Sequence, residues 1–169
     1  MEDISRGRFI RPETYGEITM EKSHVLMSGR DQIIEAVTAL FVNTDKRDWV
    51  AVRDCFTDSV LFDMSSLGGG EPADTPADTI VNDWTDDLRP LRAIHHQVGN
   101  FQVGIFGNVA DVSCYGIAYH YLPNRLNRNT RVFVGTYEIQ LVRIGDDWKI
   151  DAFRYVSKFV EGNPDLEHS

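Results

Sequence analysis

Three histidines lie in segments whose apolar pattern predicts strands: the adjacent pair His95 and His96, and His120 further along. Imidazole is the side chain whose ordinary pKa best suits proton transfer near neutral pH. Neighbouring residues of a strand point to opposite faces, so His95 and His96 are poor joint ligands for one metal ion. A metal site would also need further ligands at suitable spacing. We therefore expect acid–base chemistry and no metal.

A histidine becomes a stronger candidate when a carboxylate faces the same cavity, because the acid orients the imidazole and favours its charged form. Asp45 and Asp63 are the two carboxylates considered for that role. Taken alone, each has an ordinary explanation, Asp45 as a loop cap and Asp63 as a satisfied strand carboxylate. Each histidine, taken alone, is likewise more often structural than catalytic.

The spacing of apolar residues predicts the elements that would position these side chains. Helical spacing predicts a first helix over about 28–43 and a short second helix capped by Asp48. A third helix is expected to begin at the hydroxyl cap of Thr75, after a short strand over 60–64. Beyond residue 93 the period changes to two, which predicts strands over about 94–106, 109–122, 131–144 and 147–158.

Alternation along these strands predicts a cavity on one face of the sheet. Strand 109–122 carries small side chains on the face that ends at His120, and tyrosines on the other face. We expect helices and a cavity to cover the first face and another subunit to cover the second. Phe133 and Tyr137 share one face of the following strand. Arg154 falls on an apolar face, where it could orient an anionic or carbonyl group, although such an arginine more often pairs with an acid.

Composition limits the class of protein and its partners. The 169 residues suit one domain over 28–160, with an arm over 1–27 and a tail over 161–169. A net charge of −9, with no basic cluster, argues against nucleic acid as a partner. No segment approaches the roughly 20 apolar residues of a membrane span, and no secretory signal is visible. We expect a cytoplasmic protein whose Cys55 and Cys114 are free thiols.

Several segments resemble the nuclear-transport-factor-two-like (SnoaL-like) superfamily, and the resemblance covers about residues 28–160. The similar segments are 45–49, 56–60 with Asp63, 94–100 and 145–150. The resemblance implies an α+β fold, a cone-shaped α+β barrel with three N-terminal helices packed on a curved, mostly antiparallel sheet that encloses a pocket. The superfamily contains dehydratases, cyclases, isomerases, epoxide hydrolases and non-enzymes, so the fold alone does not specify an activity.

Within the superfamily, the scytalone dehydratase branch offers a catalytic comparison. By position, His96 is similar to its first catalytic histidine, His120 to its second, and Asp45 to the aspartate that pairs with the second. The places of its two water-holding tyrosines are taken here by Thr44 and Met64. The resemblance therefore retains the acid–base residues but not the residues that polarise the substrate, and scytalone is not the expected substrate.

We expect a cofactor-independent lyase, a dehydratase or cyclase that acts on a small cyclic or polyketide-like ketone. His120, oriented by Asp45, would take or shuttle a proton, while His96 would act as an acid or hold a water. Residues expected to contact the hydrophobic ligand are Met64, Trp84, Phe133, Tyr137 and Arg154.

Two alternatives remain open. The first is a steroid-type ketone isomerase in which Asp63 is the base and Tyr137 donates a hydrogen bond to an enolate. The second is a non-catalytic module for small-ligand binding or dimerisation, which needs only the cavity and the aromatic strand face. A homodimer or homotrimer is expected in every case.

Overall fold

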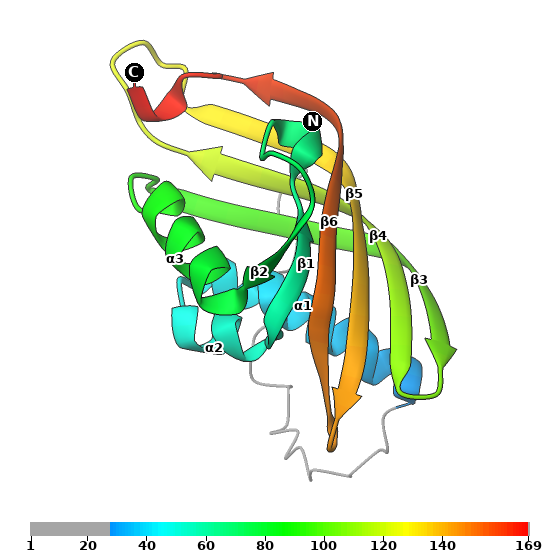
Figure 1. The fold of residues 1–169 in the computed structure, drawn as a ribbon. Coiled ribbons are helices and arrows are strands. Elements are labelled where there is room, and N and C mark those ends of the chain that lie inside the picture. The colour runs from blue at the N-terminus through cyan, green and yellow to red at the C-terminus, as the bar shows by residue number, and fades with distance from the viewer. Residues whose placement is uncertain (1–27, 169) are drawn as a thin grey trace, which may run out of the picture.

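The computed structural model describes residues 28–168, in which three α-helices pack on one six-stranded sheet (Figure 1). The helices are α1 (Gly29–Lys46), α2 (Trp49–Asp54) and α3 (Ala77–Leu88). The strands are β1 (Phe56–Asp63), β2 (Ala73–Pro76), β3 (Ala93–Phe106), β4 (Val109–Tyr121), β5 (Thr130–Ile144) and β6 (Asp147–Gly162). Two short 3₁₀ turns are η2 (Ser65–Leu67) and η3 (Leu166–His168). The predicted arm over 1–27 lies outside the described residues.

The sheet has the order β2-β1-β6-β5-β4-β3. Every neighbouring pair is antiparallel except β1 and β6, which run parallel, so the sheet is mixed and mostly antiparallel. The long strands β3 to β6 curve strongly, and the helices gather against one side of the sheet (Figure 1). The predicted cone-shaped α+β fold is confirmed, although the sheet does not close into a complete barrel.

Capping explains where the helices begin. The Ser28 hydroxyl and the Asp48 carboxylate each accept a hydrogen bond from the backbone three residues further on, at 3.2 and 3.1 Å. The expected cap of the third helix is wrong, because Thr75 lies in β2 and pairs with β1. α3 begins at Ala77 without a side-chain cap, directly after a proline whose ring restricts the backbone.

The predicted inner face of β4 is buried. Ala110, Val112, Cys114 and Ala118 are at most 5% exposed, and His120 is half-buried on the same face. The outward residues include tyrosines that are exposed to solvent. The inner residues pack against α1, whose apolar stripe of Ile33, Val37 and Leu40 is fully buried.

The alternation of β6 changes part-way along the strand. Asp151 has no partner on β5, because the pairing passes from its preceding residue directly to the residue that follows it. Such a bulge moves the side chains that follow it to the opposite face, as far as a second irregularity in the pairing at Lys158. Phe153 and Tyr155 therefore enter the core, at 2% and 3% exposure. The expectation that Arg154 faces the pocket is wrong for the same reason.

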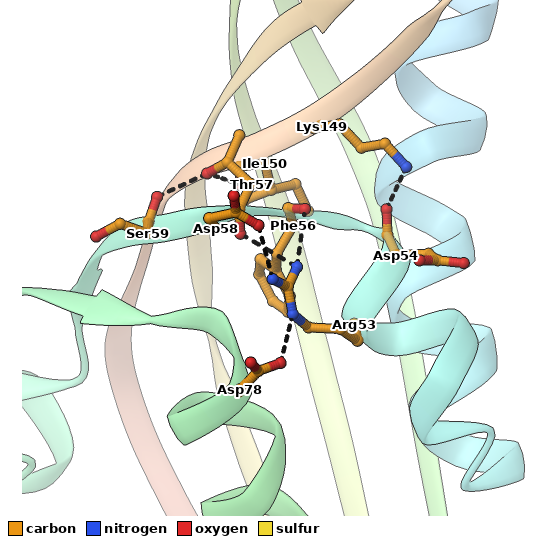
Figure 2. Close-up of polar contacts among 9 residues, drawn as sticks. All are labelled: Arg53, Asp54, Phe56, Thr57, Asp58, Ser59, Asp78, Lys149 and Ile150. Atoms are coloured by element: carbon orange, nitrogen blue, oxygen red, sulfur yellow. Dashed lines mark hydrogen bonds and ion pairs between the residues drawn. The ribbon is translucent and has the colours of Figure 1, made fainter.

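A polar network on the outside of the molecule joins α2, β1 and α3 (Figure 2). Arg53 donates from Nε to the Asp78 carboxylate at 2.6 Å and from Nη2 to the Asp58 carboxylate at 2.9 Å. Lys149 of β6 donates to the backbone carbonyl of Asp54 at 2.5 Å. Exposed pairs of this kind contribute little stability one by one. Together they set the start of α3 relative to the sheet edge.

The segment predicted as a tail is packed into the domain. β6 continues to Gly162, and Leu166 of η3 is 0% exposed among the apolar side chains of Leu88, Leu91 and Ile94. The fold therefore extends beyond the predicted boundary at residue 160. Among the described helices, none is long and apolar enough to cross a membrane.

Candidate active site

A cavity of about 680 Å³ lies between the helices and the inner face of the sheet. The predicted ligand-contacting residues Met64, Trp84, Phe133 and Tyr137 all line it, together with Phe41 and Phe153. Its polar lining includes the side chains of His96, His120, Arg131, Tyr155 and Glu167. The cavity thus combines aromatic walls with a few polar groups, as small-molecule sites usually do.

Asp45 and His96 form a hydrogen-bonded pair at this cavity. Asp45, in the last turn of α1, accepts from Nδ1 of His96 at 2.6 Å and from the His96 backbone N–H at 2.8 Å. Both side chains are largely buried, with exposed fractions of 12% for His96 and 18% for Asp45. A carboxylate only accepts, so Nδ1 carries the proton and Nε2 of the neutral ring carries the lone pair. Among residues 28–168, Nε2 has no hydrogen-bond partner.

The position of Asp45 is held by the residue that ends α1. Arg47 caps the helix in the left-handed conformation, with φ of 58°. Its Nη2 donates to the backbone carbonyls of Leu88 and Leu91, at 3.2 and 2.5 Å. One guanidinium therefore ties the end of α1 to the connection between α3 and β3. This contact keeps the carboxylate opposite the strand that carries His96.

The structure brings Asp45, His96 and His120 together but pairs them differently from the sequence-based expectation. Asp45 hydrogen-bonds to His96, not to His120. The reason is that α1 packs against the edge strand β3, whereas His120 lies one strand further in. His96 pairs with Ala118 in the β3–β4 ladder, so His120 is its diagonal neighbour on the same face. The oriented histidine is therefore His96.

His120 instead faces Arg131, which lies directly opposite it on β5. Nη2 of Arg131 is 3.5 Å from Nδ1 of His120, and the guanidinium also pairs with the Glu167 carboxylate of η3. Burial lowers the pKa of His120 to about 4, and the positive charge of Arg131 acts in the same direction, as does that of His96 once it has taken up a proton. Arg131 could have been found from its alternation with Phe133, but nothing in the sequence pattern indicates Glu167.

Two tyrosines reach the cavity because glycines lie beneath their rings. A Cβ at Gly116 would be 2.1 Å from Cε2 of Tyr137, and one at Gly135 would be 2.5 Å from the Tyr155 hydroxyl oxygen. Burial raises the pKa of both phenols, that of Tyr155 to about 12. The Tyr155 hydroxyl is buried and has no hydrogen-bond partner among the described residues. Tyr155 is thus a protonated donor, which the sequence analysis missed because of the bulge in β6.

The comparisons with known proteins identify the family and the fold. The SnoaL-like domain matches residues 26–154, about three quarters of the chain. The chain belongs to the SnoaL-like domain family. No curated protein sequence matches the chain closely enough to count as a relative.

Solved structures of other proteins show the same fold. The Kfla4162 protein from Kribbella flavida superposes with a TM-score of 0.77 at 23% identity, covering 83% of this chain and 97% of its own. The protein named "Putative Scytalone Dehydratase" from Novosphingobium aromaticivorans gives 0.70 at 14% identity, covering 79% and 87%. A hexachlorocyclohexane dehydrochlorinase (LinA), type 2, gives 0.67 at 12% identity, covering 79% and 88%. These similarities concern the fold.

Asp63 and Arg154, which were predicted as a possible base and as a ligand contact, lie outside the cavity lining. Asp63 accepts hydrogen bonds from the hydroxyl and backbone N–H of Ser65, at 2.6 and 2.9 Å, which lower its pKa. Arg154 is half-exposed and pairs with Asp63 at 3.0 Å and with Glu138 at 3.1 Å. The cavity lining contains neither residue. An isomerase with Asp63 as its base is therefore not supported, and Arg154 is no ligand contact in this cavity.

His95 is not part of the cavity lining and its side chain is 70% exposed, although its Nδ1 comes within 3.8 Å of the Asp45 carboxylate. Among the described residues, no group of three His, Cys, Asp or Glu side chains is arranged to hold a metal ion.

Proposed function

We propose that this protein is a cofactor-independent lyase that removes a proton next to the carbonyl group of a small cyclic ketone. The reaction is a dehydration, or a cyclisation that starts from the same carbanion. The observation that carries this proposal is the Asp45–His96 pair at the cavity wall, with Nδ1 bound to the carboxylate at 2.6 Å and Nε2 unpartnered among the described residues.

In the proposed reaction, Nε2 of His96 takes the proton from the carbon beside the carbonyl group. Asp45 stabilises the imidazolium that forms and keeps the ring in the tautomer that acts as a base. The electron pair of the broken C–H bond moves onto the carbonyl oxygen, to which His120 in the cavity wall can donate a hydrogen bond. In a dehydration, the carbonyl group is then restored, the C=C bond forms as the C–O bond breaks, and the departing hydroxyl takes the proton from His96 and leaves as water.

The shape and lining of the cavity support a small, mainly apolar substrate. A volume of about 680 Å³ is in the range of small-molecule sites. Aromatic side chains such as Phe41, Trp84 and Phe133 offer faces and edges on which a ring can stack. Two proteins with this fold carry the names of elimination enzymes, a dehydratase and a dehydrochlorinase, which supports the lyase class.

The test uses a panel of cyclic β-hydroxy ketones, with formation of the conjugated enone followed by its ultraviolet absorbance. We expect His96→Ala and Asp45→Asn to lower kcat by about 10²–10⁴-fold, the usual contribution of a positioned base. Asp63→Asn is the matched control for Asp45→Asn, because this carboxylate is not part of the cavity lining and should leave kcat unchanged.

Two results would count against the lyase. Full turnover by His96→Ala would show that the base lies elsewhere. If the wild-type protein bound panel members, measured by isothermal titration calorimetry, but converted none of them, the non-catalytic binding module would be the better assignment.

A further inference from the structure

We propose that Arg131 and Glu167 are positioning residues that hold His120 as a neutral imidazole with its Nε2–H available to the carbonyl oxygen of the substrate. The η3 turn, which lies outside the strands and helices that build the cavity, would then be a working part of the site. This inference rests on the proposed function for the role of His120, although the geometry of the three residues stands independently of it.

Apolar packing holds the η3 turn in place. Leu166 is 0% exposed and packs against Leu88, Leu91 and Ile94, near the end of α3 and the start of β3. The preceding segment is fixed to β5, since the backbone N–H of residue 163 donates to the Thr130 carbonyl at 2.8 Å. The position of Glu167 is therefore set without any contribution from its charge.

Glu167 in turn fixes the guanidinium of Arg131. Nη1 donates to Glu167 Oε2 at 2.9 Å and to the Pro164 carbonyl at 3.1 Å, while Nη2 donates to Glu167 Oε1. A carboxylate that engages both terminal nitrogens holds the planar guanidinium in one orientation. The Phe133 ring supports the group from one side, with its centroid 5.2 Å from Cζ. Both partners are largely buried, at 17% and 21% exposure.

Arg131 determines which nitrogen of His120 carries the proton. Its Nη2 is 3.5 Å from Nδ1, and a guanidinium has donors but no acceptor. Nδ1 must therefore present its lone pair, which leaves the proton on Nε2. Burial is the main reason that the ring stays neutral at physiological pH, and the charge of Arg131 also opposes its protonation. His96 opposes it too once it has taken up a proton, whereas Glu167 and Asp45 favour it.

The two histidines of the cavity are consequently held in opposite tautomers. Asp45, an acceptor, places the proton of His96 on Nδ1 and leaves Nε2 as a base. Arg131, a donor, leaves the proton of His120 on Nε2. In the neutral ring this Nε2–H group donates a hydrogen bond and cannot accept one. A base and a neutral hydrogen-bond donor on one sheet face are what proton removal beside a carbonyl group requires. An ion pair that served only to attach η3 would not affect the tautomer of His120.

Histidine tautomers in the full chain can be read directly by long-range ¹H–¹⁵N correlation spectra, without any substrate. In the wild type we expect a single Nε2–H form of His120 with a pKa of about 4. In Arg131→Met the pKa should rise towards 6.5, because a positive neighbour is lost, and both tautomers should appear. Glu167→Gln, which is nearly isosteric, should also give a mixture of tautomers because the guanidinium is no longer held.

The control is Arg154→Met, which breaks an arginine–carboxylate pair on the opposite face and should leave His120 unchanged. If Arg131→Met does not fold, as judged by thermal unfolding, Glu167→Gln carries the test. An Nδ1–H form of His120 in the wild type, or an unaltered Nε2–H form in both variants, would overturn the proposal. Failure of the lyase assignment would appear differently, as turnover that survives His96→Ala while the tautomer results stand.

Discussion

A methyl group added at Gly116 tests whether the aromatic wall of the cavity rests directly on the sheet. The new Cβ would be 2.1 Å from Cε2 and 2.6 Å from Cδ2 of Tyr137, distances that real Cβ atoms do not tolerate. The ring cannot simply move aside, because it is in contact with three other rings at centroid distances of 4.6, 4.9 and 5.6 Å: Phe41, Tyr155 and Phe153. Overpacking of a well-filled core costs about 1–3 kcal/mol.

For a chain of this length, each kcal/mol lowers Tm by about 2–4 °C, so Gly116→Ala should lower Tm by about 2–12 °C. Thermal and urea unfolding followed by circular dichroism would measure the loss. Gly99→Ala is the matched control, because an added Cβ there meets nothing within 4 Å and its φ is not in the left-handed region. That variant should be neutral or slightly more stable, through the reduced entropy of the unfolded chain.

The displaced ring should also affect the site. Phe41 lies between Tyr137 and His96, with its centroid 5.3 Å from the imidazole, so a shift of Tyr137 should narrow the cavity and weaken ligand binding. If Gly116→Ala unfolded at the same temperature as the wild type and Gly99→Ala, the tight contact between ring and strand would be refuted.

Three further outcomes are expected. His120 is neutral in the folded state down to about pH 4 but titrates near 6.5 when unfolded, so the unfolded chain binds more protons between those values and stability falls as the pH falls. Urea unfolding at pH 7 and pH 4 should show the wild type losing about 3 kcal/mol more than His120→Asn; equal losses would contradict the assignment. Asp86 and Asp87 give the cavity lining a negative charge, since Glu167 and Arg131 pair with each other. Calorimetry at low salt should therefore show a ligand carboxylate binding on the order of tenfold more weakly than its methyl ester, with a smaller difference at high salt. The exposed tyrosine face of β4 is proposed to pack on another copy of the chain. Tyr119→Arg should therefore shift the sedimentation coefficient towards that of the monomer. A wild type that is monomeric at every concentration would rule out this interface.

The period-two pattern was sufficient to predict which side of β4 faces the core, because that strand runs without interruption through the buried face. The same reasoning failed on β6, where Asp151 is skipped by the pairing and the later residues change sides. Arg154 was therefore placed inside and Tyr155 was overlooked. No feature of the amino-acid pattern around Asp151 indicates a bulge, since it depends on how the neighbouring strand is paired.

The sequence predicted which residues make up the site, but not which of them hydrogen-bond to each other. Asp45, His96 and His120 do meet, but which imidazole receives the carboxylate depends on the strand that α1 crosses, and helical periodicity carries no such information. Arg131 was open to the same alternation argument that identified Phe133. Glu167 was not, because its place follows from a turn anchored by one buried leucine, more than thirty residues from its partner in the sequence.

The parallel pairing of β1 with β6 has a consequence for synthesis on the ribosome. β1 lies beside the strand that follows it by about 90 residues, so the β2-β1 hairpin stays separate from the β5-β4-β3 sheet until β6 has emerged from the exit tunnel. Meanwhile the edges of β1 and β5 are both open, which exposes nascent chains to unwanted strand pairing. Contacts between such distant segments also slow folding. Ribosome-bound chains that stall before residue 147 should therefore lack the cavity and depend on chaperones to stay soluble.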